Sequence, residues 1–567
     1  MTSAAGGRGR VIVVGSGGAG LCAAIAAREA GADVLLLSKA PLGMASCTAY
    51  AGGGFTAPVD GLSVEEHMAM TRQVGRGLSE PALSAAVSGG AAAAFERLRQ
   101  WGVRYDTRRG GLSVGRYSMG GKLSGTGLTL PLRDRAIAAG VETRVGPVVT
   151  AILRSDGGLG RAAGVEYYDP AKGEVGREPA AAVIVATGGG GAAFPRSDNP
   201  ARTTGDGYRL LFAAGVELYD FEFVQWYPLG YADEGFPIWM IGLPIVDHVP
   251  LENSAGERFY DKLLAAWGLR GGREANLFAR DRSAIAIASE YQAGREVFLR
   301  YDLAPAEMLG QIDELAAARF QTIGGPRPVR VEPLVHYFCG GAVATPDGVT
   351  SVPGLFACGE VVGGFDGANR MGGNALTAVT VMSQLTGDRA GAFAAGGGAG
   401  RAGAAADASA AHACGSIAEL AAAWKANAAE RAVPAPSGEG LRGRIQAAIG
   451  RGLGLVRTDE GIRECQEQLG QLSMVLPDLV SATARDRLLA VECVSMLAVG
   501  ALVARAAGHR PESRGVHYRT DFPAEDEAWR KHIVLTPAAD AAAAAAAAYA
   551  GLPQAGIRYA GVGEVVL

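Results

Sequence analysis

Three widely separated stretches of the chain share one pattern, a short run of consecutive hydrophobic residues followed by glycines. The first is Val11–Val14, the second lies within "AAVIVATGGGG" (Ala181–Gly191) and the third within "GLFACGEVVGG" (Gly354–Gly364). An unbroken apolar run of this length is typical of a fully buried strand. After the first run come a helix of small residues and a second strand, Val34–Leu37, which together predict a βαβ unit. We therefore expect one nucleotide-binding sheet assembled from distant pieces of chain.

Changes of sequence texture between these runs predict the domain organisation. An aromatic-rich stretch interrupts the nucleotide-binding domain and predicts an inserted capping domain, while Ala/Gly-rich sequence with little pattern predicts a loose linker or exposed helix. Amphipathic sequence such as "RTDEGIRECQEQLGQL" predicts a helical C-terminal domain. The octa-alanine Ala541–Ala548 is interpreted as a helical or disordered surface segment. The expected segments are residues 1–225 (first part of the nucleotide-binding domain), 226–335 (capping domain), 336–390 (second part), 391–437 (linker) and 438–567 (C-terminal domain).

Composition narrows the class of protein. The chain has 567 residues, a net charge of −4 and a pI of about 6.1, so a nucleic-acid partner is not expected. Its seven cysteines are scattered without a CxxC pair, which argues against a disulfide framework or an internal iron–sulfur site. No apolar run is expected to reach the roughly 20 residues of a membrane span. The N-terminus lacks signal-peptide features, and we expect a reduced, cytoplasmic protein.

The glycines after the first strand form a dinucleotide-binding motif. Gly15, Gly17 and Gly20 give G-x-G-x-x-G between a strand and a helix. The first glycine allows the tight turn, the second admits the pyrophosphate and the third lets helix and strand pack closely, with the helix N-terminus facing the phosphates. The acid that usually follows the second strand is absent, because "LLLSKA" places Ser38 and Lys39 there. The motif predicts dinucleotide binding without separating FAD from NAD.

Two later segments favour FAD. "VIVATGGG", with Thr187 and Gly188, is similar to the strand and turn that meet the nucleotide in two-dinucleotide-type flavoproteins. "GLFACGEVVGG" carries an acid, Glu360, at the position where such proteins contact the ribityl chain of the flavin. The predicted fold class is therefore α/β, a two-dinucleotide-type FAD-binding Rossmann-like domain with an inserted α+β capping domain and a helical C-terminal domain.

Almost the whole chain resembles the flavoprotein family of fumarate reductase, succinate dehydrogenase and L-aspartate oxidase. The matching segments are "SKAPLGMASCTAYAGGG", "TTGDGYRL", "SAGERFYD", "FARD", "HYFCGG", "GANRMGGNAL", "LVRTDEGIREC" and "RPESRGVHYRTDFP". The resemblance implies that Arg280 of "FARD" delivers a proton to the substrate, while flavin N5 supplies a hydride. It also implies that His336 and Arg370 bind a substrate carboxylate beside the flavin, where they stabilise the charge that develops in the transition state.

The same resemblance implies the cofactor contacts. Ala375 takes the place of a common serine in the flavin-binding segment, and Asp206 of "TTGDG" falls near the other end of the cofactor. The remaining contacts that the family match implies are Cys47, Thr48, Gly53, Gly54, Glu360, Asn374 and Leu376.

The chain departs from the family at the distal end of the substrate. In "VQWYPLG", Tyr227 replaces a histidine that binds a second carboxylate and Leu229 replaces a threonine; Ile241, with Trp239 and Met240, stands in place of polar groups. A second carboxylate would lose several kcal/mol of hydration against such side chains. Tyr227, Leu229 and Ile241 are therefore predicted to contact a distal group that is not a carboxylate. The alternative is a shifted alignment.

That alternative would place the true polar residues at Asp247 and His248. A third departure is Cys47, which stands where the family links its flavin covalently through histidine. We expect tight, non-covalent FAD, with a cysteinyl link as the alternative.

Three functions stay open. The first is a flavin-dependent oxidoreductase acting next to a carboxylate of a small molecule, such as a 2-enoate reductase. The second is an amino-acid oxidase similar to L-aspartate oxidase. The third is the flavoprotein component of an electron-transfer complex, whose helical tail and "RPESRG" segment would bind an iron–sulfur protein. NAD(P)H also stays open as an electron donor.

Overall fold

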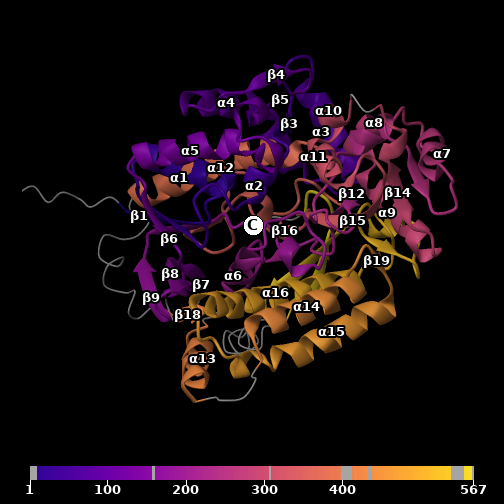
Figure 1. Cartoon of the computed structure of the whole chain (residues 1–567). Coiled ribbons are helices and arrows are strands. Elements are labelled where there is room, and N and C mark those ends of the chain that lie inside the picture. The colour runs from indigo at the N-terminus through magenta and orange to yellow at the C-terminus, as the bar shows by residue number, and fades with distance from the viewer. Residues whose placement is uncertain are drawn as a thin grey trace, which may run out of the picture.

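The computed structural model describes residues 9–155, 160–305, 308–396, 412–414, 417–430, 436–537 and 555–564. Its centre is a five-stranded parallel sheet in the order β17-β10-β1-β2-β6 (Figure 1). Four of the strands are short and largely buried, as their apolar runs predict, whereas the edge strand β6 is mostly exposed. The strands are β1 (Arg10–Val14), β2 (Asp33–Ser38), β6 (Glu142–Val145), β10 (Ala182–Val185) and β17 (Leu355–Ala357). The α/β fold class, with one sheet built from distant pieces of chain, is confirmed.

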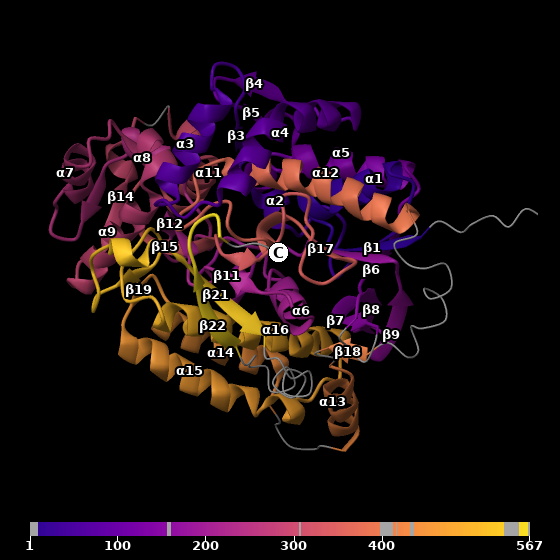
Figure 2. The same cartoon turned by 180° about the vertical axis from the view of Figure 1, so that it is seen from behind.

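Two helices rich in small residues lie against one face of this sheet. These are α1 (Gly18–Glu29) and α12 (Asn374–Ala395), which run side by side in Figures 1 and 2. A Cβ atom built on Gly391 would come within 2.8 Å of the carbonyl oxygen of Ala27, so glycine allows the close approach of the two helices. This packing brings the loop before α12 next to the loop before α1, although more than 300 residues separate them.

The capping domain has its own antiparallel sheet in the order β12-β15-β14-β13 and its own hydrophobic core. Helix α9 packs on β12, which places the first residue of α9 at the boundary with the nucleotide-binding domain. The strands are β12 (Val224–Tyr231), β13 (Leu251–Asn253), β14 (Val297–Arg300) and β15 (Pro328–Phe338), and the helices that concern the site are α7 (Phe259–Ala266), α8 (Gly272–Phe278) and α9 (Arg280–Gln292).

The C-terminal region begins with three packed helices, α14 (Gly438–Gly452), α15 (Asp459–Ser473) and α16 (Ala484–Gly508). The expectation of a helical domain to the end of the chain is wrong beyond α16. Strand β21 (His532–Pro537) pairs antiparallel with β11 (Leu218–Tyr219) of the nucleotide-binding domain, and β22 (Ala555–Ala560) pairs with β21 (Figure 2). Sequence periodicity does not reveal such a pairing because the partner strands lie more than 300 residues apart. The octa-alanine segment lies outside the described residues.

Helix α16 corrects the expectation about apolar runs. Its 25 residues reach a mean hydropathy of 1.9 over an 18-residue window, enough to cross a membrane by length and composition. However, 83% of that window is buried inside the protein, against α14, α15 and α6 (Asp206–Ala213). The core helix of a domain meets the same test, so the apolar character of α16 is explained by its packing.

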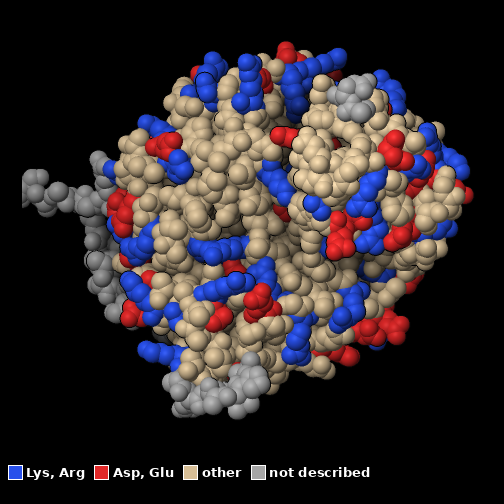
Figure 3. All heavy atoms as spheres, viewed as in Figure 1, with Lys and Arg blue, Asp and Glu red and all other residues tan. Residues whose placement is uncertain are grey.

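The segment expected as a linker contains regular structure where it is described. Helix α12 continues to Ala395, and α13 (Ala418–Glu430) follows. Trp424 of α13 is buried and donates from Nε1 to the carbonyl oxygen of Leu476, at 2.7 Å. Acidic and basic side chains are interspersed over the face of the molecule in Figure 3, in keeping with the small net charge.

Candidate active site

A cavity of about 450 Å³ opens where the parallel strands end and the capping domain meets them. The carboxyl ends of parallel strands meet at one edge of a sheet, so the loops after β1, β2, β10 and β17 all reach this cavity. The predicted site residues that line it are Gly15, Gly17, Ser38, Lys39, Cys47, Thr48, Gly54, Thr187, Gly188, Asp206, Tyr227, Arg280, His336, Glu360, Arg370, Ala375 and Leu376.

Five predicted site residues do not line the cavity. They are Gly20, Gly53, Leu229, Ile241 and Asn374. A Cβ built on Gly20 would overlap the carbonyl oxygen of Gly15, so Gly20 serves helix–strand packing. Gly53 has φ +71° in a turn near Ser124. The amide of Asn374 is occupied by His67 (2.9 Å) and Thr71 (3.1 Å) within the protein.

The loop after β1 suits a phosphate group. Gly15 has φ +107°, which favours glycine, and Gly17 precedes the first turn of α1, whose backbone N–H groups have no acceptor within the helix; that of Gly18 donates to Thr48 Oγ1 at 3.2 Å. The hydroxyl Oγ1 of Thr187, at the end of β10, is buried and has no hydrogen-bond partner among the described residues. The glycine loop leaves room for the phosphates of a dinucleotide, and the Thr187 hydroxyl is available to hydrogen-bond to it.

Lys39 lies at the far end of the cavity in a buried group of charges. Its Nζ is 2.7 Å from Asp206 Oδ2 and 3.1 Å from Glu492 Oε1, and 2.8 Å from the Oγ1 of Thr204. Burial alone would lower the pKa of Lys39, but the charges of Asp206 and Glu492 raise it. Glu492 belongs to α16, so the C-terminal domain contributes to this end of the site. Nothing in the local sequence marked Glu492, because its role depends on the packing of α16.

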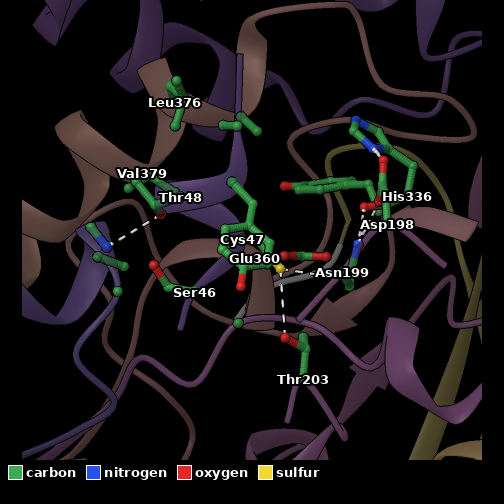
Figure 4. A pocket seen from close by; sticks show the side chains of 18 of the residues that line it. Ser46, Cys47, Thr48, Asp198, Asn199, Thr203, His336, Glu360, Leu376 and Val379 are labelled. Atoms are coloured by element: carbon green, nitrogen blue, oxygen red, sulfur yellow. Dashed lines mark hydrogen bonds and ion pairs between the residues drawn. The ribbon is translucent and has the colours of Figure 1, made fainter. Parts of the chain in front are cut away.

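Glu360 and Cys47 lie near the middle of the cavity (Figure 4). Glu360 Oε1 accepts a hydrogen bond from the backbone N–H of Phe338 at 3.1 Å, and burial raises the pKa of Glu360 to about 7. The Sγ of Cys47 is 3.5 Å from Asn199 Oδ1 and 3.7 Å from Thr203 Oγ1. Burial and the nearby charge of Glu360 raise the pKa of the Cys47 thiol well above its usual range, so it is a neutral thiol.

Arg280, the first residue of α9, is directed towards Tyr227 and Asn276. Its Nη2 donates to Asn276 Oδ1 at 2.9 Å and its Nε to the carbonyl oxygen of Asn276 at 2.9 Å, and the guanidinium lies 4.9 Å from the centre of the Tyr227 ring. Nη1 is buried and has no hydrogen-bond partner among the described residues. Burial lowers the pKa of Arg280 to about 10.

His336 and Arg370 approach from two other segments. His336 Nδ1 is 2.7 Å from Asp198 Oδ2, and its ring meets the Tyr227 ring edge-on at 5.2 Å. Burial lowers the pKa of His336, partly offset by Asp198, so the ring is neutral near pH 7. Arg370 Nε donates to Gln225 Oε1 at 3.2 Å, and its guanidinium lies 4.4 Å from the centre of the Tyr337 ring.

Two of these hydrogen-bond partners, Gln225 and Asp198, were not predicted from the sequence. Gln225 also donates from Nε2 to Asn369 Oδ1 and to the carbonyl oxygen of Arg370, both at 2.8 Å, and so fixes the loop that carries Arg370. The signal was its position in "VQWYPLG", two residues before Tyr227. Asp198 carried no signal, because only the fold brings it to His336.

The distal end of the cavity differs from the prediction. Leu229 and Ile241 are 0% and 4% exposed in the core of the capping domain. In a regular strand Leu229 would share a face with Tyr227, but the pairing of β12 with β15 shifts register between Tyr227 and Gly230. The apolar side chains that line this end of the cavity are instead Met240, Pro244 and Leu277. The prediction was therefore wrong for Leu229 and Ile241 as lining residues.

The polar residues of the alternative alignment are not at the cavity. Asp247 accepts hydrogen bonds from the backbone N–H groups of Gly272 (2.6 Å) and Arg273 (3.3 Å) at the start of α8, and His248 is exposed. Asp281 forms an ion pair with Arg76, 205 residues away in the chain. Arg108, on the exposed strand β4 (Asp106–Arg108), is a further cation at the cavity.

Comparisons with known proteins place this site in a family. The family described as "FAD binding domain" matches residues 10–376, and the one described as "Fumarate reductase flavoprotein C-term" matches residues 442–550. One subunit of the CoM/CoB fumarate reductase of Methanothermobacter marburgensis is 30% identical over 559 residues, which cover 93% of this chain and 96% of that protein. L-aspartate oxidase of Streptomyces coelicolor is 30% identical over 571 residues, which cover 93% of this chain and 91% of that protein.

Solved structures agree with the sequence relatives. A chain of the Escherichia coli quinol fumarate reductase superposes with a TM-score of 0.81 at 26% identity, covering 99% of this chain and 97% of that one. The match extends over the capping and C-terminal regions as well as the nucleotide-binding domain. The chain therefore belongs to the FAD-dependent oxidoreductase family that contains fumarate reductases, succinate dehydrogenases and L-aspartate oxidases.

Proposed function

We propose that this FAD-dependent oxidoreductase reduces a carbon–carbon double bond next to a carboxylate, or catalyses the reverse reaction, on a substrate whose distal group is not a carboxylate. The observation that carries the proposal is the meeting of Arg280, His336 and Arg370 in one cavity with the glycine loop and Glu360. The three side chains come from different segments, and a purely structural role would not direct all of them into the cavity of a nucleotide site.

Arg370 and His336 would bind the carboxylate of the substrate. Among the described residues, the Arg370 guanidinium has one hydrogen bond, from Nε to Gln225, so its Nη groups can donate to a carboxylate. His336 donates a hydrogen bond from Nδ1 to Asp198. Its Nε2 can therefore donate to the substrate carboxylate only when the ring is protonated. An anion bound beside His336 favours that proton, and Asp198 stabilises the resulting charge. Both contacts draw electron density from the double bond and stabilise charge in the transition state.

When bound, FAD would supply the chemistry of hydride transfer, to one carbon of the double bond. Arg280 supplies the proton to the other carbon. Hydride and proton together add two electrons and two protons to the enoate. Solvent then reprotonates Arg280. An arginine is a weak acid in water, but burial brings the pKa of Arg280 to about 10, closer to the working pH of an enzyme. Its buried Nη1, without a partner among the described residues, is the atom available for this transfer.

The distal wall favours a neutral or apolar group. Met240, Pro244 and Leu277 offer no charge to a second carboxylate, whose burial there would cost several kcal/mol. The hydroxyl of Tyr227 donates to Asn276 Oδ1 at 2.8 Å and accepts from the N–H of Leu243 at 2.9 Å, so its proton is already used. Arg108 is exposed to water, and an ion pair with it would select a dicarboxylate only weakly.

The test is a substrate screen with the flavin as reporter. The protein is reduced anaerobically and mixed with unsaturated carboxylic acids, and reoxidation is followed at the flavin absorbance. We expect 2-enoates with an alkyl or aryl distal group to reoxidise the flavin faster than fumarate does. Fumarate, or a longer dicarboxylate, turning over as well as the best mono-acid would contradict the proposed distal group. A lack of reoxidation by every enoate would contradict the reaction itself.

Covalent attachment gives a separate prediction. The Cys47 side chain is a neutral thiol in this structure, whereas the thiolate is the nucleophilic form. We therefore expect acid precipitation of the native protein to release all its FAD and leave a colourless pellet. The Cys47→Ser variant is expected to hold the same amount of FAD after gel filtration. A yellow pellet from the native protein that becomes colourless in Cys47→Ser would establish a cysteinyl link instead.

A second function is favoured by the relatives, several of which are L-aspartate oxidases at 30–32% identity. Oxidation of a C–N bond next to a carboxylate would use the same three side chains. The apolar distal wall argues for an amino acid other than aspartate. Peroxide released on mixing the protein with amino acids in air, together with inactivity towards enoates, would identify this function.

We further propose an electron-transfer partner, because the similar protein of Methanothermobacter marburgensis is one of the subunits of its fumarate reductase. The tail after α16 exposes aromatic side chains, Phe522 (41%) and Tyr559 (46%). An iron–sulfur protein is the partner that we expect to bind there. Purification from the native host with a co-eluting iron–sulfur protein would support this, and a fully active isolated chain with physiological donors would not.

A further inference from the structure

Asn276 is the principal hydrogen-bond partner of Arg280. It lies on α8, four residues before Arg280 at the start of α9, and it lines the cavity. Its Oδ1 accepts from Arg280 Nη2 at 2.9 Å and Nε at 3.2 Å, and from the hydroxyl of Tyr227 at 2.8 Å. Three donors converge on this atom, so the amide oxygen, rather than its nitrogen, must face them.

No carboxylate forms an ion pair with Arg280 among the described residues. Asp281, the next residue, is bonded to Arg76, and Asp198 is bonded to His336. The ionisable groups that face Arg280 are Tyr227 of β12, Arg370 of the loop before α12, and the Asp198–His336 pair. Arg280 is 6% exposed, so its guanidinium is a buried cation whose hydrogen-bond partner is a neutral amide.

We propose that Asn276 is the positioning residue of the site, whose amide holds Arg280 in the cavity while leaving its charge uncompensated. A carboxylate at the same place would accept the same hydrogen bonds but would also stabilise the charged guanidinium and weaken it as an acid. The neutral amide therefore fixes the geometry and keeps Arg280 a better proton donor. It also leaves the full positive charge available to a bound carboxylate.

The test is Asn276→Asp, which keeps the shape and adds a charge. Arg280 must carry its proton to act as the acid, so activity is lost as pH rises through its pKa, about 10 in the native protein. An adjacent carboxylate is expected to raise that pKa by about 1–3 units, which moves the alkaline limb of kcat upwards in pH. Because a weaker acid transfers its proton more slowly, kcat near pH 8 is expected to fall by about 3- to 30-fold.

Two variants separate charge from structure. Gln311→Glu adds the same charge to the capping domain on an exposed residue and should leave both kcat and the pH limb unchanged. Asn276→Ala removes the acceptor without adding charge, and is expected to lower kcat without moving the limb upwards. FAD content and the thermal midpoint are compared for all variants, so that a folding defect is recognised. The inference is overturned if Asn276→Asp behaves as Gln311→Glu does, or if its alkaline limb does not move.

The inference rests on the proposed function, and a binding measurement keeps the two distinguishable. Calorimetry with a saturated monocarboxylate needs no turnover, and we expect Asn276→Asp to bind it about 10-fold more weakly than the native protein, because the new carboxylate compensates the positive charge of Arg280. If no enoate oxidises the reduced native flavin, the proposed reaction fails. If the native protein is active but Asn276→Asp binds the acid equally well, the role of Asn276 fails alone.

Discussion

Replacing Arg280 by lysine is expected to lower kcat for enoate reduction by about 10²- to 10⁴-fold, the range that general acid catalysis contributes. A lysine ammonium is a compact charge without the planar fork, so it cannot hold the Asn276 carbonyl and amide oxygens while directing another N–H into the cavity. Burial also lowers the pKa of a lysine by several units and removes its charge near neutral pH. The measurement is steady-state kcat and KM with the best enoate from the screen.

The control for this prediction is Arg282→Lys, the same change two residues further along α9 on an exposed side chain. Both variants should retain a full complement of FAD, because Arg280 belongs to the capping domain and not to the glycine loop. A loss of FAD in Arg280→Lys would indicate a structural role instead. Activity of Arg280→Lys within a few-fold of the native enzyme would remove Arg280 from its place as the proton donor.

The sequence pattern predicted those parts of the site that depend on local signals. Gly15 and Gly17 could be recognised because a glycine turn between a strand and a helix is a local feature. Each of the three proposed catalytic residues lies in a segment that resembles the family, namely Arg280, His336 and Arg370. Leu229 failed because a register shift in β12 changes which face a side chain occupies. A single-residue irregularity of this kind leaves no mark in the alternation of polar and apolar residues.

The residues that the sequence did not reveal act through tertiary contacts. Four polar residues have no recognisable motif around them in the sequence and acquire their partners only when the elements of the fold pack. They are Asn276, Asp198, Gln225 and Glu492. The same holds for the tail, whose segment "RPESRG" suggested a surface for a partner but proves largely buried. Arg510, Glu512 and Arg514 of that segment are at most 2% exposed.

This tail segment connects the C-terminal region to the catalytic loop. The N–H of Val516 donates to the carbonyl oxygen of Ala368 at 2.9 Å, two residues before Arg370. Arg514 Nη1 donates to the carbonyl oxygen of Arg76 at 3.2 Å, and Arg76 is the partner of Asp281 beside Arg280. Both arginines of the proposed mechanism are therefore supported from the tail. Loss of order in this segment should disturb the site although none of the described tail residues lines it.

Arg510 holds the segment in place through buried charges. Its Nε is 2.5 Å from Glu222 Oε1, its Nη1 is 3.0 Å from Glu512 Oε1 and its Nη2 is 3.5 Å from Asp220 Oδ1, with all four side chains at most 1% exposed. Further N–H groups donate to the carbonyl oxygens of Trp529 (2.9 Å) and Lys531 (3.0 Å). Glu512 also pairs with Arg514 and Asp220 with His532, whereas Arg510 is the one ion-pair partner of Glu222 among the described residues.

Removing this cation by Arg510→Ala is expected to destabilise the folded protein by about 3–5 kcal/mol, because the buried carboxylate of Glu222 is left without its ion-pair partner. Urea unfolding followed by tryptophan fluorescence should show a midpoint well below that of the native protein, and the variant should lose activity together with tail order. The matched control is Arg463→Ala, which breaks an exposed ion pair with Asp459 on α15 and should not shift the midpoint measurably. Equal midpoints for Arg510→Ala and the native protein would mean that Glu222 binds a proton or finds another partner when the arginine is absent. The tail would then be held by the pairing of β21 with β11, and the buried charges would serve only to direct the chain to that strand.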